Sequence, residues 1–331
     1  MIATVALFVG SFALTVASSL VLVEVVDRIG QRFKLSESLV GIATALAADS
    51  PEISAAITAI QGGRASLGFG VVIGSNIFNL AALLGLSAVL VGKVRIRPQA
   101  LALEGVTAMA VTLLISALVL GLLAPVPAFV LVAVVLAPYI GVSALRPDQV
   151  GRLPLPDKVR LPLASALASV DKDVRSGQTP PRADRHDLLS VVPALAAVVL
   201  GSVGMVDSAV SLGTRWGVPQ VLTGTLVLAA LTGLPNVTGA LRLARRKRGS
   251  AVVSEALNSN TLNLLAGVSI PAIIVGISSP SAATQLSVYW LLGITVVTLA
   301  FTSRRGGLGR REGAVVIAGY IAFAILLVLG V

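Results

Sequence analysis

Residues 49–52 read Asp-Ser-Pro-Glu and residues 74–79 read Gly-Ser-Asn-Ile-Phe-Asn, and both motifs lie inside long apolar runs. The second half of the chain repeats this arrangement, with Gly-Leu-Pro-Asn at 233–236 and Ser-Asn-Thr-Leu-Asn at 259–263. In both copies, the residue after the proline and the later serine are 23 positions apart. Polar motifs that recur at one spacing inside apolar segments predict two related halves with one shared site.

The composition excludes an ordinary soluble domain. Hydrophobic residues make up 56% of the 331 residues and charged residues only 12%, where a soluble domain carries about 25%. Apolar runs such as Ile2–Val23, Val106–Ala144 and Ala314–Val331 are long enough to cross a bilayer. Such segments must be helical because lipid offers the backbone no hydrogen-bond partner. The sequence therefore predicts an all-α membrane protein, with the lipid bilayer as a partner.

The apolar runs predict ten transmembrane helices. A stretch rich in Pro, Asp and Arg divides them into two sets of five, and within it we allow a helix at Leu161–Val174. We therefore predict a first five-helix repeat at 1–142, a polar cytoplasmic linker at 143–187 and a second five-helix repeat at 188–331. The predicted spans are 3–27, 36–61, 67–91, 99–122, 125–144, 188–213, 219–242, 250–278, 284–303 and 312–331.

The basic residues give an orientation to these spans. Of the 25 Lys and Arg residues, only Arg64 and Arg215 fall in connections on one side of the predicted membrane. Lys and Arg collect in cytoplasmic connections, so both termini are predicted to lie outside. The net charge of +10 then follows from topology and contact with anionic lipid. We accordingly predict no nucleic-acid partner.

An odd number of helices in each half makes the two halves insert in opposite orientations. The prediction is an inverted repeat, an architecture that places the binding site near the membrane midplane. A proline inside each motif also removes one backbone donor and clashes with the carbonyl four residues earlier, which belongs to Ala47 in one copy and to Leu231 in the other. Such freed carbonyls need a cation, water or a polar partner.

The motifs supply the oxygen atoms that hard cations such as Na⁺ and Ca²⁺ prefer. An acid at the position of Glu52 costs roughly 2.5–3.5 kcal/mol or more inside a membrane and is functional by default. Asp49 lies three residues earlier, on the same helix face, and Glu255 shares a helical stripe with Ser259. The alternatives are a helix-break cap or surface salt bridge for Asp49, and an interfacial position for Glu255. A single Ser or Asn can also serve as a contact between helices.

The two copies resemble the α-repeats of the cation/calcium exchanger superfamily, which includes the Na⁺/Ca²⁺ exchangers. In that family each repeat reads Gly-Thr-Ser-x-Pro-Glu, followed by Gly-Ser-Asn-Ile-Phe-Asn or Asp. Residues 74–79 match the second element fully, and residues 51–52 match the end of the first. The resemblance implies antiport at one central pocket, past which the first and sixth helices slide. The positions that fall on the family's site are Glu52, Ser75, Asn79, Thr232, Asn236, Ser259 and Asn263.

The chain departs from the family pattern at the first element of each repeat. Asn236 stands where the family has its second glutamate, and Ala48-Asp49 replaces Thr-Ser before the first proline. Asp49 and Glu255 are therefore candidates to replace the missing carboxylate. If Glu255 faces the pocket, the site suits a divalent ion. If it faces away, the site suits Na⁺ or H⁺ better.

These observations predict a secondary active antiporter that exchanges Ca²⁺ for Na⁺ by alternating access. The alternatives are an exchanger coupled to H⁺ or to another cation, and a non-transporting relative that lost its second glutamate. An enzyme is not predicted, because the sequence has no His-metal cluster, no plausible nucleophile–base pair and no nucleotide-binding loop. We expect inorganic cations as cargo and no cofactor. The high Ala, Gly, Val and Arg content favours a bacterial plasma membrane, and no oligomeric state is indicated.

Overall fold

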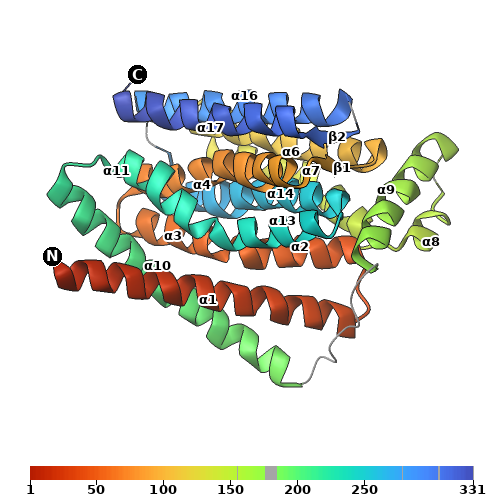
Figure 1. The fold of residues 1–331 in the computed structure, drawn as a ribbon, viewed down its shortest axis with the longest axis horizontal. Helices are drawn as coiled ribbons and strands as arrows, with labels where there is room; N and C mark the ends of the chain where they lie inside the picture. Colours follow the sequence, from red (N-terminus) through yellow and green to blue (C-terminus); the bar gives the residue numbers. More distant parts are fainter. Residues whose placement is uncertain (155, 176–184, 278, 305, 331) are drawn as a thin grey trace.

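The computed structural model describes residues 1–154, 156–175, 185–277, 279–304 and 306–330 (Figure 1). Almost all of this part of the chain is helical, as predicted, and one short antiparallel strand pair joins the two halves. The strands are β1 Lys93–Arg95 and β2 Gly307–Gly309. Three π-helical segments interrupt the α-helices: η1 Leu80–Leu86, η2 Thr223–Leu228 and η3 Leu265–Ser269.

The helices fall into three groups along the chain: those before the predicted linker, those within it and those after it. The first set is α1 Ile2–Arg32, α2 Glu37–Ala48, α3 Ser50–Gln61, α4 Ala65–Asn79, α5 Ser87–Val91, α6 Pro98–Val119 and α7 Pro125–Ser143. The linker contains α8 Pro147–Val150 and α9 Asp157–Arg175. The second set is α10 Arg185–Trp216, α11 Gln220–Leu222, α12 Ala229–Thr232, α13 Leu234–Arg245, α14 Gly249–Leu264, α15 Ile270–Val275, α16 Ala282–Arg304 and α17 Arg310–Leu329. The linker helix allowed at 161–174 is therefore confirmed and is longer than expected.

Eight helices in the described ranges are long and apolar enough to cross a membrane, and a bent pair brings the number to nine. That pair, Gln220–Thr232 and Leu234–Arg245, bends by 43° and covers the predicted span 219–242. The predicted span 36–61 was wrong as one continuous helix, because it consists of α2 and α3, of 12 residues each. The membrane-protein prediction is confirmed.

Both breaks occur at the motif prolines. Pro51 lies in the first turn of α3 and Pro235 in the first turn of α13. A proline is tolerated there because the backbone N–H of a first-turn residue has no partner within the helix. Asp49 and Gly233 are the residues between the paired helices, so the acid of the first motif sits in the break itself.

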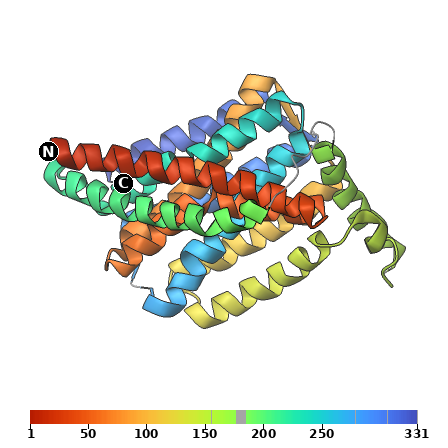
Figure 2. The same cartoon turned by 90° about the horizontal axis from the view of Figure 1, so that it is seen from below.

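The helices are arranged around a deeply buried centre. The span Ala65–Val91, which contains α4, is 89% buried in its most apolar window, against 22% for α1. Two long helices, α1 and α10, pack side by side on one face of the bundle, where they cover α2 and α3 (Figures 1 and 2). Two others, α16 and α17, lie on the opposite face (Figure 1). The exposed apolar side chains of these outer helices form the surface that lipid would cover.

Glycine allows the two halves to approach closely at the centre. A Cβ atom on Gly74 would lie 2.1 Å from the backbone oxygen of Thr225, and one on Gly224 would lie 2.4 Å from that of Leu67. Neither partner is a side chain that could move aside. The contact between α4 and η2 therefore requires glycine, as expected for helices that pack through small residues.

We expect Gly74→Ala to lower the free energy of unfolding by about 1–3 kcal/mol, because overpacking a close backbone contact strains both segments. Thermal unfolding of the purified protein in detergent measures this effect. Gly293→Ala in α16 is the matched control, since a Cβ there meets nothing within 4 Å. Equal melting temperatures for the two variants would contradict the close-contact interpretation.

Candidate cation site

The site lies where the two helix breaks meet α4 and α14. Hydrogen bonds join residues from opposite halves of the chain, and the polar side chains involved are almost completely removed from solvent. Eight of the predicted site residues are buried, namely Asp49, Glu52, Ser75, Asn79, Thr232, Asn236, Ser259 and Asn263. Such a concentration of buried polar groups in an apolar bundle calls for a compensating ligand or a complete hydrogen-bond network.

Asp49 is the centre of this network. Its Oδ1 atom accepts a hydrogen bond from Nδ2 of Asn236 at 2.7 Å and from Oγ of Ser259 at 2.6 Å. Ser259 in turn accepts from Nδ2 of Asn79 at 3.0 Å. The other carboxylate oxygen, Oδ2, is buried and has no hydrogen-bond partner among the described residues. The Oδ1 atom of Asp49 is thus held directly by α13 and α14 and, through Ser259, indirectly by α4, while its Oδ2 atom is left free of hydrogen bonds from the described residues.

The two alternatives for Asp49 do not fit this geometry. Its side chain makes no capping hydrogen bond to α3. Each ion pair found between described residues is formed by other acids. The carboxylate instead points to α13 and α14, which belong to the other half of the chain.

Glu52 is fully buried next to Asp49. Its Oε1 atom accepts from the same Asn236 amide nitrogen at 3.4 Å, and Oε2 is buried with no partner within the described ranges. One N–H group therefore stands between two carboxylates. A neutral amide provides far less compensation than a cation, so the pair leaves strong demand for positive charge.

Five polar side chains of the motifs carry further oxygen atoms that are buried with the acids. The side-chain oxygens of Asn79, Asn236 and Asn263 have no hydrogen-bond partner in the described part of the chain. The hydroxyl groups of Ser75 and Thr232 donate to Val72 and Leu228 in their own helices, at 3.1 and 2.8 Å. Their oxygen lone pairs remain available to a ligand.

Glu255 lies beside this centre and faces α13. Its Oε1 atom would be 2.8 Å from a Cβ on Gly239, and Oε2 has no partner among the described groups. Its carboxylate interacts electrostatically with Asp49. No three acidic or histidine side chains of the described residues are grouped closely enough to form a metal cluster. The structure therefore brings Asp49 and Glu52 together as a pair and leaves Glu255 at the edge.

The backbone carbonyl of Ala47, which Pro51 deprives of its helical donor, accepts hydrogen bonds from two serine side chains. The oxygen of Ala47 accepts from Oγ of Ser50 at 2.7 Å and from Oγ of Ser19 at 3.2 Å. Ser19 lies on α1, and its hydroxyl also approaches the carbonyl of Ala48 at 3.4 Å. The break therefore does not offer an open carbonyl at Ala47. It is tied instead to the outer helix that covers it.

Sequence reasoning assigned no role to the middle asparagine of each motif. Asn76 donates from Nδ2 to the backbone oxygen of Asn260 at 2.9 Å, and Asn260 donates to that of Asn76 at 3.1 Å. Equivalent residues of the two motifs thus bind each other reciprocally, as residues related by a two-fold axis do. The occurrence of Asn at the same place in both copies was the signal for this contact.

Long apolar helices around a buried, acid-containing polar centre define a multi-pass membrane protein. The family model for sodium/calcium exchanger protein matches residues 3–146 and matches again over residues 186–329. This chain belongs to the sodium/calcium exchanger protein family, whose members are ion antiporters. The resemblance inferred from the motifs is therefore confirmed.

Individual relatives agree with this assignment. The sodium/calcium exchanger MaX1 of Methanosarcina acetivorans is 27% identical over 147 residues, which cover 43% of this chain and 40% of MaX1. The putative antiporter CaxA of Alkalimonas amylolytica is 25% identical over 315 residues, 90% of each chain.

Two kinds of solved structure share the fold. The sodium-calcium exchanger NCX_Mj superposes with a TM-score of 0.64 at 18% identity, and the alignment covers 97% of both chains. The H⁺/Ca²⁺ exchanger CAX superposes with a TM-score of 0.73 at 14% identity, covering 98% of this chain and 86% of that one. At this identity the likeness shows the fold alone.

Proposed function

We propose that the protein is a secondary active antiporter that exchanges Ca²⁺ for Na⁺ by alternating access at a site near the membrane midplane. The observation that carries this proposal is the buried pair of Asp49 and Glu52, each with one carboxylate oxygen that accepts no hydrogen bond from the described residues. Two adjacent carboxylates surrounded by amide and hydroxyl oxygens match the ligand preferences of Ca²⁺. The proposed site residues are Asp49, Glu52, Ser75, Asn79, Thr232, Asn236, Ser259 and Asn263, with Glu255 beside them.

The same oxygens would serve both ions, and this competition gives the exchange. Ca²⁺ would neutralise both carboxylates at once, whereas Na⁺ ions would do so one at a time. By linkage, each ion lowers the apparent affinity of the other. Asn236 would take part by rotating its amide, because a half-turn replaces the N–H group between the acids with its free oxygen.

The repeated structure supports an inverted repeat of two five-span halves. A separation of 184 residues relates Asn76 to Asn260 and Glu52 to Asn236. The same separation relates the first residues of α3 and α13, of α4 and α14, and of α6 and α16. Counting α2 with α3 as one broken span completes the ten spans, with repeats at 1–142 and 188–331 around the linker. The start of α1 and the end of α17 lie at one end of the bundle, as an even total number of spans requires (Figure 1). The linker helix α9 lies at the other end, as five spans before it require.

We propose that α1 and α10 open the site to each side in turn. They pack mainly on each other and cover α2 and α3 from one face. The contact of Ser19 with the carbonyls of Ala47 and Ala48 is the point where α1 holds the helix break. A slide of α1 would exchange these hydrogen bonds and so couple the outer helices to the acid pair. The proposed location is a bacterial plasma membrane, with the linker in the cytoplasm and both termini outside.

Binding of radioactive Ca²⁺ to the purified protein in detergent tests the shared site. We expect added Na⁺ to weaken apparent Ca²⁺ affinity by about tenfold or more, and Ca²⁺ to weaken Na⁺ binding by the same factor. Choline chloride at equal concentration is the control for ionic strength. Ca²⁺ binding that resists Na⁺ but falls with acidification would favour the H⁺-coupled alternative. Absence of Ca²⁺ binding would favour the non-transporting relative, which Asn236 in place of a glutamate motivates.

A further inference from the structure

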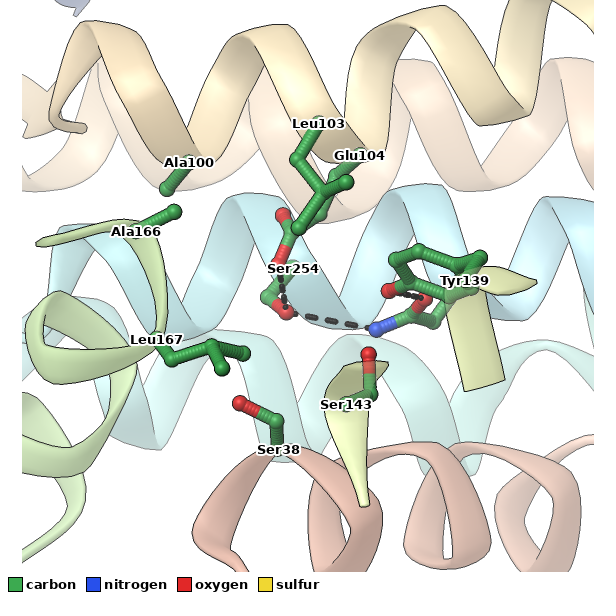
Figure 3. Close-up of a pocket in the computed structure, with 10 residues that line it drawn as sticks. Ser38, Ala100, Leu103, Glu104, Tyr139, Ser143, Ala166, Leu167 and Ser254 are labelled. Atoms are coloured by element: carbon green, nitrogen blue, oxygen red, sulfur yellow. Dashed lines mark hydrogen bonds between the residues drawn. The ribbon is translucent and has the colours of Figure 1, made fainter. Parts of the chain in front are cut away.

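A small polar cavity lies at the linker end of the bundle, beneath α9 (Figure 3). Its walls come from α2, α6, α7 and α14, and the linker helix α9 closes it with Ala166 and Leu167. Its volume is about 10 Å³, roughly the space that one water-sized sphere needs. The cavity therefore fits a single water molecule or one small monatomic ion.

The cavity contains a buried acid that the proposed exchange does not use. Glu104 of α6 is only 7% exposed, and its Oε1 atom accepts from Oγ of Ser254 at 2.7 Å. Its Oε2 atom is buried and accepts no hydrogen bond from the described residues. No Lys or Arg of that part of the chain forms an ion pair with it. Burial of an uncompensated carboxylate is costly, so this group needs either a bound cation or a proton to neutralise it.

The hydrogen bonds around Glu104 all run in one direction. Tyr139 donates from its hydroxyl to Oδ1 of Asn258 at 2.5 Å, and Asn258 donates from Nδ2 to Oγ of Ser254 at 3.2 Å. Ser254 then donates to the acid, as Figure 3 shows. The oxygen atoms of these side chains line the cavity together with the carboxylate, and they retain lone pairs that can accept. The hydroxyl groups of Ser38 and Ser143 add two more oxygens to its wall (Figure 3).

We propose that the cavity around Glu104 is a second cation site, which binds one Na⁺ ion beneath α9. The wall provides one carboxylate and several neutral oxygens, which is the ligand type of a hard cation. A single negative charge is balanced by a monovalent ion, and the small volume excludes a hydrated one. This site is separate from the exchange site, and the proposal does not depend on which ions are exchanged there.

The cavity is connected to the acid pair through helix α14, which contributes residues to both. Asn258 is followed in α14 by Ser259, whose hydroxyl holds Asp49. Leu167 in α9 packs over the cavity from the linker. An ion at Glu104 would therefore fix α14 and α9 relative to α6 and α7. The predicted consequence is a stabilisation by Na⁺ that survives removal of the central acids.

The test is thermal unfolding of the full chain in detergent, with Na⁺ titrated against choline at constant ionic strength. The starting protein carries Asp49→Asn and Glu52→Gln, which remove both central charges. We expect Na⁺ to raise the melting temperature of this protein, because a ligand that binds only the folded state stabilises it. Adding Glu104→Gln should abolish the rise, whereas adding Glu24→Gln at an exposed position should leave it unchanged.

Tyr139→Phe provides a milder second variant that keeps the carboxylate. We expect it to raise the Na⁺ concentration for half-maximal stabilisation by roughly tenfold, and it still tests the site if Glu104→Gln fails to fold. The proposal is overturned if Na⁺ has no more effect than choline on the starting protein, or if its effect survives Glu104→Gln. It is also overturned if only pH changes the melting temperature, since a proton would then neutralise Glu104. If the native protein shows no transport, but Na⁺ still raises the melting temperature of the starting protein through Glu104, the proposed function is contradicted and the second site is not.

Discussion

Glu52→Gln is expected to reduce Ca²⁺ uptake by about 100-fold or more. The substitution keeps the size of the side chain and removes one of the two charges that would hold the ion. Removing one partner of a buried, hydrogen-bonded charge pair costs about 2–5 kcal/mol, and each 1.4 kcal/mol corresponds to tenfold in affinity. Ca²⁺ uptake into proteoliposomes measures the loss, and equilibrium Ca²⁺ binding shows whether it arises at the site.

The matched control is Glu24→Gln. Glu24 is also an acid on an apolar helix, but its side chain is 68% exposed and pairs with Arg28. Its removal should change uptake by less than about twofold, since exposed ion pairs contribute about 0–1 kcal/mol. Asp49→Asn should behave like Glu52→Gln, because both acids have a free buried oxygen. Normal uptake in either central variant would remove the acid pair from the ion path.

Asn236→Glu is expected to raise Ca²⁺ affinity by about tenfold or more, because Ca²⁺ affinity rises with the number of charged ligands. Asn236 now donates to Asp49 and approaches Glu52, so a carboxylate there would place three acids around one point. The same repulsion should destabilise the protein in the absence of Ca²⁺. Ca²⁺ should therefore raise the melting temperature of Asn236→Glu by more than it raises that of the native protein.

Asn236→Gln separates the effect of charge from the effect of size. It has the length of glutamate and the neutral amide of asparagine, so it should not gain Ca²⁺ affinity. If Asn236→Glu weakens Ca²⁺ binding while Asn236→Gln does not, the amide is an adaptation to a different ion. That result would favour exchange of a monovalent cation at this site.

The sequence predicted the parts of the structure that follow from local chemistry. Apolar length predicted the long helices, and the prolines at 51 and 235 lie where two of the predicted spans are in fact broken. The common spacing of the motifs predicted that Asp49, Glu52 and Ser259 would meet, although they are far apart in the chain. The family was also predictable, because Gly-Ser-Asn-Ile-Phe-Asn at 74–79 is a specific motif.

The partners of individual side chains were not predictable, because they depend on how helices are rotated against each other. Nothing local indicates that Ser19 of α1 would be the group that binds the carbonyl of Ala47, which was expected to need a cation, water or a polar partner. The role of Asn236 as a donor to two acids likewise requires the distance between the two halves. Glu104 and Tyr139 lie in helices without a motif, so their cavity appears only once α6, α7 and α14 are packed.

The measurement that tests the central claim most directly is radioactive Ca²⁺ uptake into proteoliposomes under an outward Na⁺ gradient, an outward H⁺ gradient or no gradient. Na⁺-driven uptake that is lost in Glu52→Gln is the predicted result. Uptake driven only by the H⁺ gradient would contradict the Na⁺ assignment while keeping the site. No Ca²⁺ uptake under any gradient would contradict the proposed calcium exchange.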